Sequence, residues 1–215
     1  VDLAMIILPP KLALKAVEKK KKKGVGGIVI VSAGFREVGG EGLDVENKIV
    51  ELCREAGVRL IGPNCLGVIN PVDSVRLNAS FSTRMPDVGN ISFISQSGAL
   101  CTSVLDVAAD RQFGFSKFIS IGNKADVDEL DLLQYLHRDP DTEVIMMYIE
   151  ELRRGPEFIE AVKKITSGPR RTPILAIKSG RTTAGAKAAS SHTGSLAGSE
   201  GVYDAIFNQS GIIRV

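Results

Sequence analysis

The stretch ISFISQSGALCTSVLDVAA, residues 91–109, predicts a buried strand that runs through a small polar turn into a helix. Ser95, Gln96, Ser97 and Gly98 form the turn. The free backbone N–H groups and the positive end of the helix dipole make such a turn an anion site, to which serine hydroxyls add donors. An ordinary N-capping serine is the alternative, but it leaves the second serine and the glycine without a role.

Similar apolar runs recur along the whole chain, with amphipathic segments between them. The runs are continuous rather than alternating, which is typical of parallel strands that are covered on both faces. We therefore expect an α/β fold built from βαβ units. The expected strands lie in LAMIIL, GIVIVSAG, VRLIGPN, NISFIS, FSKFISIGN, EVIMMYIE, TPILAIKSG and GIIRV, and the expected helices span 11–23, 42–56, 98–112, 128–138, 156–166 and 198–209.

A break in this alternation falls at NPVDSVRLNASFSTRMPDVG, which is rich in turn residues and has no sustained periodicity. We expect one α/β unit over residues 1–83 and a second over residues 88–215. The first unit has only three expected strands, few for an open doubly wound sheet, and the sequence does not begin with Met. The interpretation is that the N-terminal half of the first unit is absent from this sequence.

The composition, 44% hydrophobic and 24% charged residues, is that of an ordinary globular protein. The basic run Lys19–Lys23 precedes Gly24 and indicates the solvated end of a helix. Aromatic residues make up 5% of the chain and Trp is absent, so no stacking platform for nucleic-acid bases is expected. No apolar run reaches the length of a membrane span and no signal peptide opens the sequence, so no membrane is expected either.

Three cysteines, Cys53, Cys65 and Cys101, are too few and too widely spaced for a disulfide framework or a cysteine-based zinc site. They favour a reducing compartment, and we expect a cytoplasmic protein with no metal ligands in this chain. His137 ends the segment LLQYLH before Asp139 and is interpreted as a cation at a helix C-terminus.

The other histidine, His192, lies in SSHTGSLAGS, a run of small residues between an expected strand and an expected helix. A polar surface loop would explain this composition, but a loop of small residues can also approach another surface closely. Imidazole can act as a covalent nucleophile, and a phosphoryl group on it would need donors and helix dipoles to hold its charge. Because the carboxyl ends of parallel strands share one edge, this loop and the Ser97 turn should face each other.

Glu150 and Glu151 follow the strand IMMYI at that same edge. A carboxylate there could orient the imidazole and favour its reactive tautomer, although a solvated pair of glutamates is the plainer interpretation. In the first unit, IILPPK, IVSAGF and GPNCLG are three strand ends with small or Pro-containing turns. A crevice at such ends is a common nucleotide or cofactor site.

Taken in order, LPP, VSAGF, GPNCLGVINP, SQSGAL, SIGNKADVDELDLLQYLHRDPDTEVIMMYIE and SSHTGSLAGS closely resemble the α-type part of the NDP-forming acyl-CoA synthetases. This superfamily includes ADP-forming acetyl-CoA synthetase and the succinyl-CoA synthetase α subunit. The resemblance covers nearly the whole chain. It implies a partial CoA-binding Rossmann-like domain followed by a flavodoxin-like parallel-sheet ligase domain.

By this resemblance His192 would be the transiently phosphorylated histidine and Glu150 the glutamate that steadies it, with Glu151 a lesser candidate. Phosphate attacks an acyl-CoA to give acyl phosphate and CoA, His192 takes the phosphoryl group, and its loop carries that group to ADP. The residues implied to bind phosphate are Ser97, Gly98 and Ala99, and those implied to line the coenzyme A site are Leu8, Pro9, Ser32, Ala33, Asn64 and Cys65.

Two departures from the family pattern matter. The glycine-rich phosphate turn that opens the family's CoA domain does not occur in this sequence, and ELRRG follows the strand where the succinyl type has a glycine-rich run. The second departure points to the acetyl-CoA synthetase branch.

No ATP-grasp domain occurs in the sequence, so ADP or ATP, with Mg, would bind to a partner ATP-grasp domain or β-type subunit, and the assembly is expected to be an oligomer. The alternative is a non-catalytic CoA-binding regulatory module of a ligase-like protein acetyltransferase.

Overall fold

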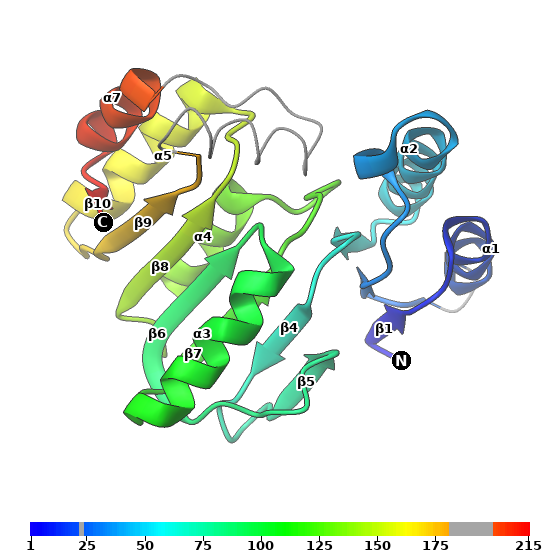
Figure 1. Ribbon diagram of the computed structural model, residues 1–215, viewed down its shortest axis with the longest axis horizontal. Coiled ribbons are helices and arrows are strands. Elements are labelled where there is room, and N and C mark those ends of the chain that lie inside the picture. The colour runs from blue at the N-terminus through cyan, green and yellow to red at the C-terminus, as the bar shows by residue number, and fades with distance from the viewer. Residues whose placement is uncertain (22–23, 181–199) are drawn as a thin grey trace.

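The computed structural model describes residues 1–21, 24–180 and 200–215, and these form two sheets with helices packed on them (Figure 1). The α/β class expected from the sequence is confirmed. Each expected strand and helix is present within the described ranges, although several strands are shorter than the apolar runs that predicted them.

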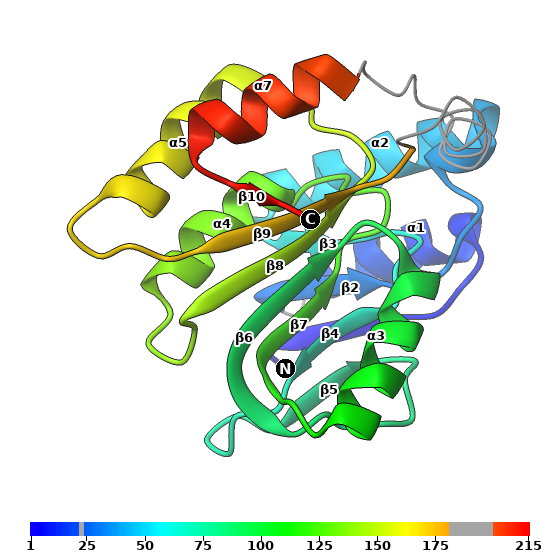
Figure 2. The same ribbon diagram turned by 60° about the vertical axis from the view of Figure 1, so that its left-hand side comes forward.

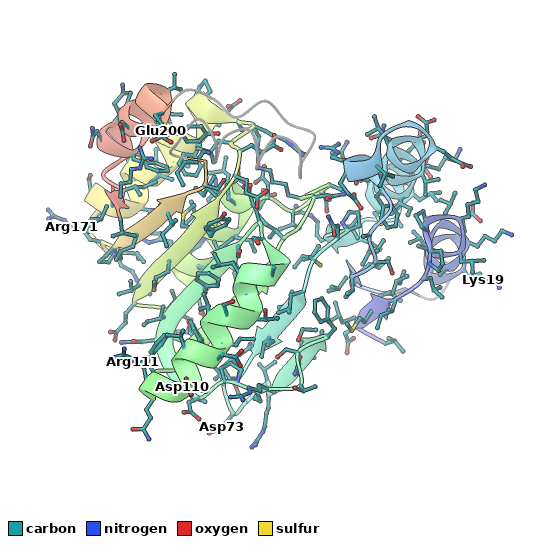
Figure 3. All side chains as sticks on the ribbon, viewed as in Figure 1. Lys19, Asp73, Asp110, Arg111, Arg171 and Glu200 are labelled. Carbon is teal, nitrogen blue, oxygen red and sulfur yellow. The ribbon has the colours of Figure 1, made fainter. Side chains whose placement is uncertain are left out.

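The first sheet contains three parallel strands in the order β1-β2-β3. Their apolar residues form one core with the helices α1 and α2, whose faces meet over the sheet. Lys19, near the end of α1, is exposed and points away from the rest of the molecule (Figure 3), as expected for a solvated helix end. The elements are β1 (Leu3–Ile6), α1 (Pro10–Lys21), β2 (Gly27–Ile30), the short helix η1 (Arg36–Val38), α2 (Gly40–Glu55) and β3 (Arg59–Ile61).

The second sheet contains seven strands in the order β10-β9-β8-β6-β7-β4-β5. The five strands from β10 to β7 run parallel to one another, whereas β4 is antiparallel to both β5 and β7. The elements are β4 (Gly67–Asn70), β5 (Leu77–Ser80), β6 (Val88–Ser95), α3 (Gly98–Arg111), β7 (Phe115–Ser120), α4 (Glu129–Arg138), β8 (Val144–Ile149), α5 (Gly155–Ser167), β9 (Ile174–Lys178), α7 (Glu200–Ser210) and β10 (Ile213–Arg214).

Helices lie on both faces of the second sheet (Figure 2), and each face has its own apolar core. On one face α3 packs Cys101 and Leu105 onto a cluster of phenylalanines that includes Phe93 and Phe118. On the other face α4, α5 and α7 bury apolar side chains against β6, β7, β8 and β9. Helices on both faces explain why the central strand β7 is buried along its whole length.

The strand pair β4 and β5 is the feature that the sequence did not predict. Both strands lie before residue 83 in the chain, yet they hydrogen-bond into the second sheet, with Val68 opposite Ile119 of β7. The division of the chain at residues 83 and 88 stays a prediction.

The carboxyl ends of the parallel strands lie together in each sheet. In the first sheet Ile6 lies opposite Ile30, and in the second Ser95 lies opposite both Ser120 and Tyr148. Within the described part of the chain, no helix combines the length and the apolar character that crossing a membrane requires.

Candidate active site at the strand ends

The N-terminus of α3 follows directly from β6 and has the capped geometry expected of the polar turn. The Ser97 side chain accepts a hydrogen bond from the Leu100 backbone at 3.3 Å, while Ser95 Oγ accepts from the Ser97 N–H at 3.0 Å. The first N–H groups of a helix, here those of Gly98 and Ala99, have no acceptor within the helix itself. The turn can therefore offer donors and a positive dipole end to an anion.

Gln96 lies in the same turn and binds the end of β8 with both ends of its side-chain amide. Its Oε1 accepts hydrogen bonds from the backbone N–H groups of Glu150 and Glu151, at 2.8 and 3.0 Å. Its Nε2 donates to the carbonyl of Glu151 at 2.8 Å. Glu150 thus follows a strand whose end is held by the neighbouring strand-to-helix turn.

Lys124 follows β7 and reaches the same carbonyl. Its Nζ donates to Glu151 O at 2.6 Å and to both carboxylate oxygens of Glu129 at 3.1 Å. The side chains of Lys124 and Glu129 are only 2% and 4% exposed. Burial lowers the pKa of Lys124 and raises the pKa of Glu129, and their mutual attraction opposes both shifts.

A cavity of about 50 Å³ lies where these turns meet the first unit. Its lining is polar and carries three basic and three acidic side chains, so it suits a small charged group better than an apolar one. It is lined by Arg36, Glu37, Asn64, Gln96, Gly122, Asn123, Lys124, Glu150, Glu151 and Arg153.

Hydrogen bonds through Asn123 join the turn after β7 to η1 and α2 beside this cavity. The Asn123 amide donates to Glu37 at 2.6 Å and to Glu46 at 2.9 Å, and it accepts from Asn64 at 3.3 Å. Glu46 is 1% exposed and pairs with Arg36 at 2.9 Å. Burial alone would raise the pKa of Glu37, but the hydrogen bonds from Asn123 and from backbone amides outweigh it and lower that pKa.

The residues implied to line the coenzyme A site lie at the three strand ends of the first sheet. Leu8, Pro9 and Ala33 are exposed, and Ser32 accepts a hydrogen bond from the Asn64 backbone at 2.9 Å. Among these residues only Asn64 lines the cavity. The strand ends therefore form an open surface that leads to the cavity at Asn64.

Cys65 contributes differently from its neighbours because its side chain is buried. Its Sγ donates to the Ile30 carbonyl at 3.3 Å, and burial raises the pKa of this thiol to about 12. A Cβ placed on Gly98 would lie 3.5 Å from the Leu66 N atom, so the backbone after Cys65 adjoins the first turn of α3. Cys65 can thus shape the site through its backbone, while its thiol is neutral at physiological pH.

His192 lies outside the described residues. Of the other residues singled out in the sequence, Asn64, Gln96, Glu150 and Glu151 line one cavity, next to Ser97 in the same turn as Gln96. His137 lies near the end of α4, where its Nδ1 is 2.9 Å from the Thr172 hydroxyl. No role was expected for the side chains of Gln96, Asn123 and Lys124, although each lies at the end of an expected strand or directly after one.

The fold and the site together define an α/β protein with a polar cavity where turns from its two sheets meet. Residues 88–215 match the family described as the succinyl-CoA ligase like flavodoxin domain, and residues 1–71 match a CoA binding domain. Since the first match covers more than half of the sequence, the chain belongs to the succinyl-CoA ligase like flavodoxin family.

Known relatives agree with the resemblance seen in the sequence. The chain is 49% identical, over its full length, to an ADP-forming acetate–CoA ligase I of Archaeoglobus fulgidus, and covers 30% of that protein. It is 45% identical to the α subunit of ADP-forming acetate–CoA ligase II of Pyrococcus furiosus, with 99% of this chain and 45% of that subunit covered. The chain therefore spans less than half the length of these relatives.

A solved structure of similar sequence agrees with these relatives. The chain superposes on the dinucleotide forming acetyl-coenzyme A synthetase 1 of Ca. Korarchaeum cryptofilum, in complex with phosphate and ADP, with a TM-score of 0.92 and 40% identity. The match covers all of this chain and 45% of that one.

Proposed function

We propose that this chain is the α-type part of an NDP-forming acyl-CoA synthetase, which interconverts acyl-CoA, ADP and phosphate with acid, CoA and ATP. The observation that carries the proposal is the convergence of the α3 N-terminus, Glu150 and Asn64 at one junction between the two units. The ADP-forming acetate–CoA ligases among its relatives support the same reaction class.

Ser97, Gly98 and Ala99 would hold phosphate, because helix N–H groups and a hydroxyl favour an anion. Phosphate attacks the thioester carbonyl, and CoA leaves as the thiol. His192 then attacks the phosphorus of the acyl phosphate and the carboxylate leaves, with Glu150 orienting the imidazole. Transfer from His192 to ADP gives ATP.

The first unit fits coenzyme A at its strand ends, where exposed small and apolar side chains leave room for a ligand. Leu8, Pro9, Ser32 and Ala33 would contact it there, with Asn64 and Cys65 at the side nearest the cavity. Coenzyme A supplies the thioester whose cleavage drives the reaction. ADP or ATP, with Mg, would bind to an ATP-grasp domain or subunit that completes an oligomeric, cytoplasmic enzyme.

Phosphorylation of His192 is the decisive test. We expect the full-length protein, incubated with ATP and its nucleotide-binding part, to gain one phosphoryl group in an acid-labile, alkali-stable linkage. His192→Ala should abolish the label and the control His137→Ala should keep it, as measured by intact mass. Full labelling of His192→Ala would refute the assignment, and an unlabelled wild-type protein that binds CoA would favour the regulatory module instead.

A further inference from the structure

Side chains from other elements bind four backbone groups in the segment that follows β8. Gln96 accepts from the N–H groups of Glu150 and Glu151, and it shares the Glu151 carbonyl with Lys124. The next N–H group, that of Leu152, donates to the Tyr203 hydroxyl at 3.1 Å. The three binding side chains come from the turn after β6, the turn after β7 and helix α7, so the position of this segment depends on tertiary structure.

Stability alone gives a poor account of Lys124. Its φ of 45° is a left-handed conformation that costs about 1–2 kcal/mol in a residue other than glycine. Its ammonium group is buried with Glu129, and replacing a buried ion pair by apolar side chains often leaves stability unchanged or raises it. An apolar side chain at position 124 could not donate the hydrogen bond that Lys124 Nζ makes to Glu151 O at 2.6 Å.

We infer that Gln96 and Lys124 are positioning residues for Glu150: by binding the backbone N–H groups of Glu150 and Glu151 and the carbonyl of Glu151, they set where the Glu150 carboxylate lies in the cavity. The inference rests on the proposed function, in which Glu150 takes part in phosphoryl transfer. Both residues also line that cavity, but their side-chain hydrogen bonds go to the end of β8 and to Glu129.

Kinetics of the full-length enzyme with its nucleotide-binding part test the inference through the variant Lys124→Met. We expect kcat to fall roughly 10-fold to 100-fold, because a misplacement of about 1 Å in a catalytic group can cost about 100-fold. The KM values for phosphate and CoA should change by less than about twofold. The variant does not alter the groups proposed to bind these substrates, so the binding that the ground state and the transition state share is kept. Lys124→Arg keeps the cation and should recover part of kcat.

A matched control exists within β7 itself, the strand that precedes Lys124. Lys117 of β7 is also buried and pairs with Asp139 at 2.8 Å, far from the β8 carboxyl end. Lys117→Met should lower the melting temperature as Lys124→Met does, but kcat per folded molecule should stay at the wild-type level.

A double variant sharpens the test. Because Gln96 and Lys124 share the Glu151 carbonyl, Gln96→Met combined with Lys124→Met should lower kcat by less than the product of the two single effects. Equal kcat losses in Lys124→Met and Lys117→Met, or a loss confined to KM, would overturn the inference. A wild-type enzyme without acyl-CoA synthetase activity would overturn the proposed function instead.

Discussion

Gly122 allows the turn after β7 to touch the turn after β3. Its φ is +51°, and a Cβ there would lie 2.2 Å from Asn64 O and 2.3 Å from Pro63 O. Since both atoms belong to the backbone, neither can move aside without shifting Asn64, which lines the cavity. Gly122→Ala should therefore lower the free energy of unfolding by several kcal/mol, beyond the roughly 1–2 kcal/mol of a left-handed alanine alone.

The matched control is Gly57→Ala. Gly57 also has a positive φ, +65°, but a Cβ there meets nothing within 4 Å. The free energy of unfolding of both variants, measured by chemical denaturation, separates two effects. Gly57→Ala reports the strain of the left-handed backbone alone, and Gly122→Ala adds the clash with the carbonyls of Pro63 and Asn64. If the two variants lost equal free energy, the contact between the turns would contribute nothing.

At single positions, the sequence predicted which residues lie at the strand ends, but not which side chains hydrogen-bond to those residues. Glu150 and the Ser97 turn could be predicted to lie at one edge, because the carboxyl ends of parallel strands in a sheet lie together. Asn64 follows a strand of the other sheet, so its approach to Glu150 could not be predicted in this way. The bonds from Gln96 and Lys124 to Glu151 span 55 and 27 residues and depend on side-chain reach across the second sheet. No local pattern encodes that reach.

Helix α3 carries a prediction at the scale of one element. Ser97→Ala removes the cap on Leu100, which should cost about 1 kcal/mol of stability. The same change removes a donor from the proposed phosphate site, where one lost donor typically costs about 3–4 kcal/mol of transition-state stabilisation. The rate of His192 labelling should therefore fall roughly 100-fold or more, far beyond the loss of stability.

Asp128→Ala is the control for this variant. Asp128 caps α4 through Leu130 and Asp131 and also pairs with Arg154, so its loss should destabilise at least as much. Its labelling rate per folded molecule should stay near wild type. Equal effects of the two variants on labelling would mean that the Ser97 turn is only structural.

Most elements could be predicted from the sequence because a continuous apolar run marks a strand that is buried on both faces. The pair β4 and β5 escaped this signal for a physical reason. GVIN and LNAS are short, lie in a segment rich in turn residues, and include half-buried polar positions near the sheet edge. The pairing of β4 with β7 joins residues about 50 positions apart, which periodicity does not reveal.

At the scale of the whole molecule, Asn123 connects the two units through Glu37 and Glu46. Asn123→Ala would leave Glu46 buried with Arg36 as its remaining charged partner, and the loss of hydrogen bonds to carboxylates should cost about 1.5–3 kcal/mol. Since the chain contains no Trp, urea unfolding is best followed by circular dichroism. As a control, Asn47→Ala at an exposed position should leave the free energy of unfolding nearly unchanged. An equally small loss in Asn123→Ala would show that the hydrogen bonds of Asn123 do not hold these parts of the molecule together.

The strands β4 and β5 also set a condition for dissecting this protein into parts. They come from residues that precede the family match beginning at 88, yet β4 covers the outer edge of β7 and β5 pairs with β4. A fragment trimmed to that match would expose the N–H and C=O groups of the β7 edge, which invite pairing with a second molecule and aggregation. The family match therefore begins later in the chain than a fragment that resists aggregation can begin. Such a fragment should start no later than Gly67, the first residue of β4.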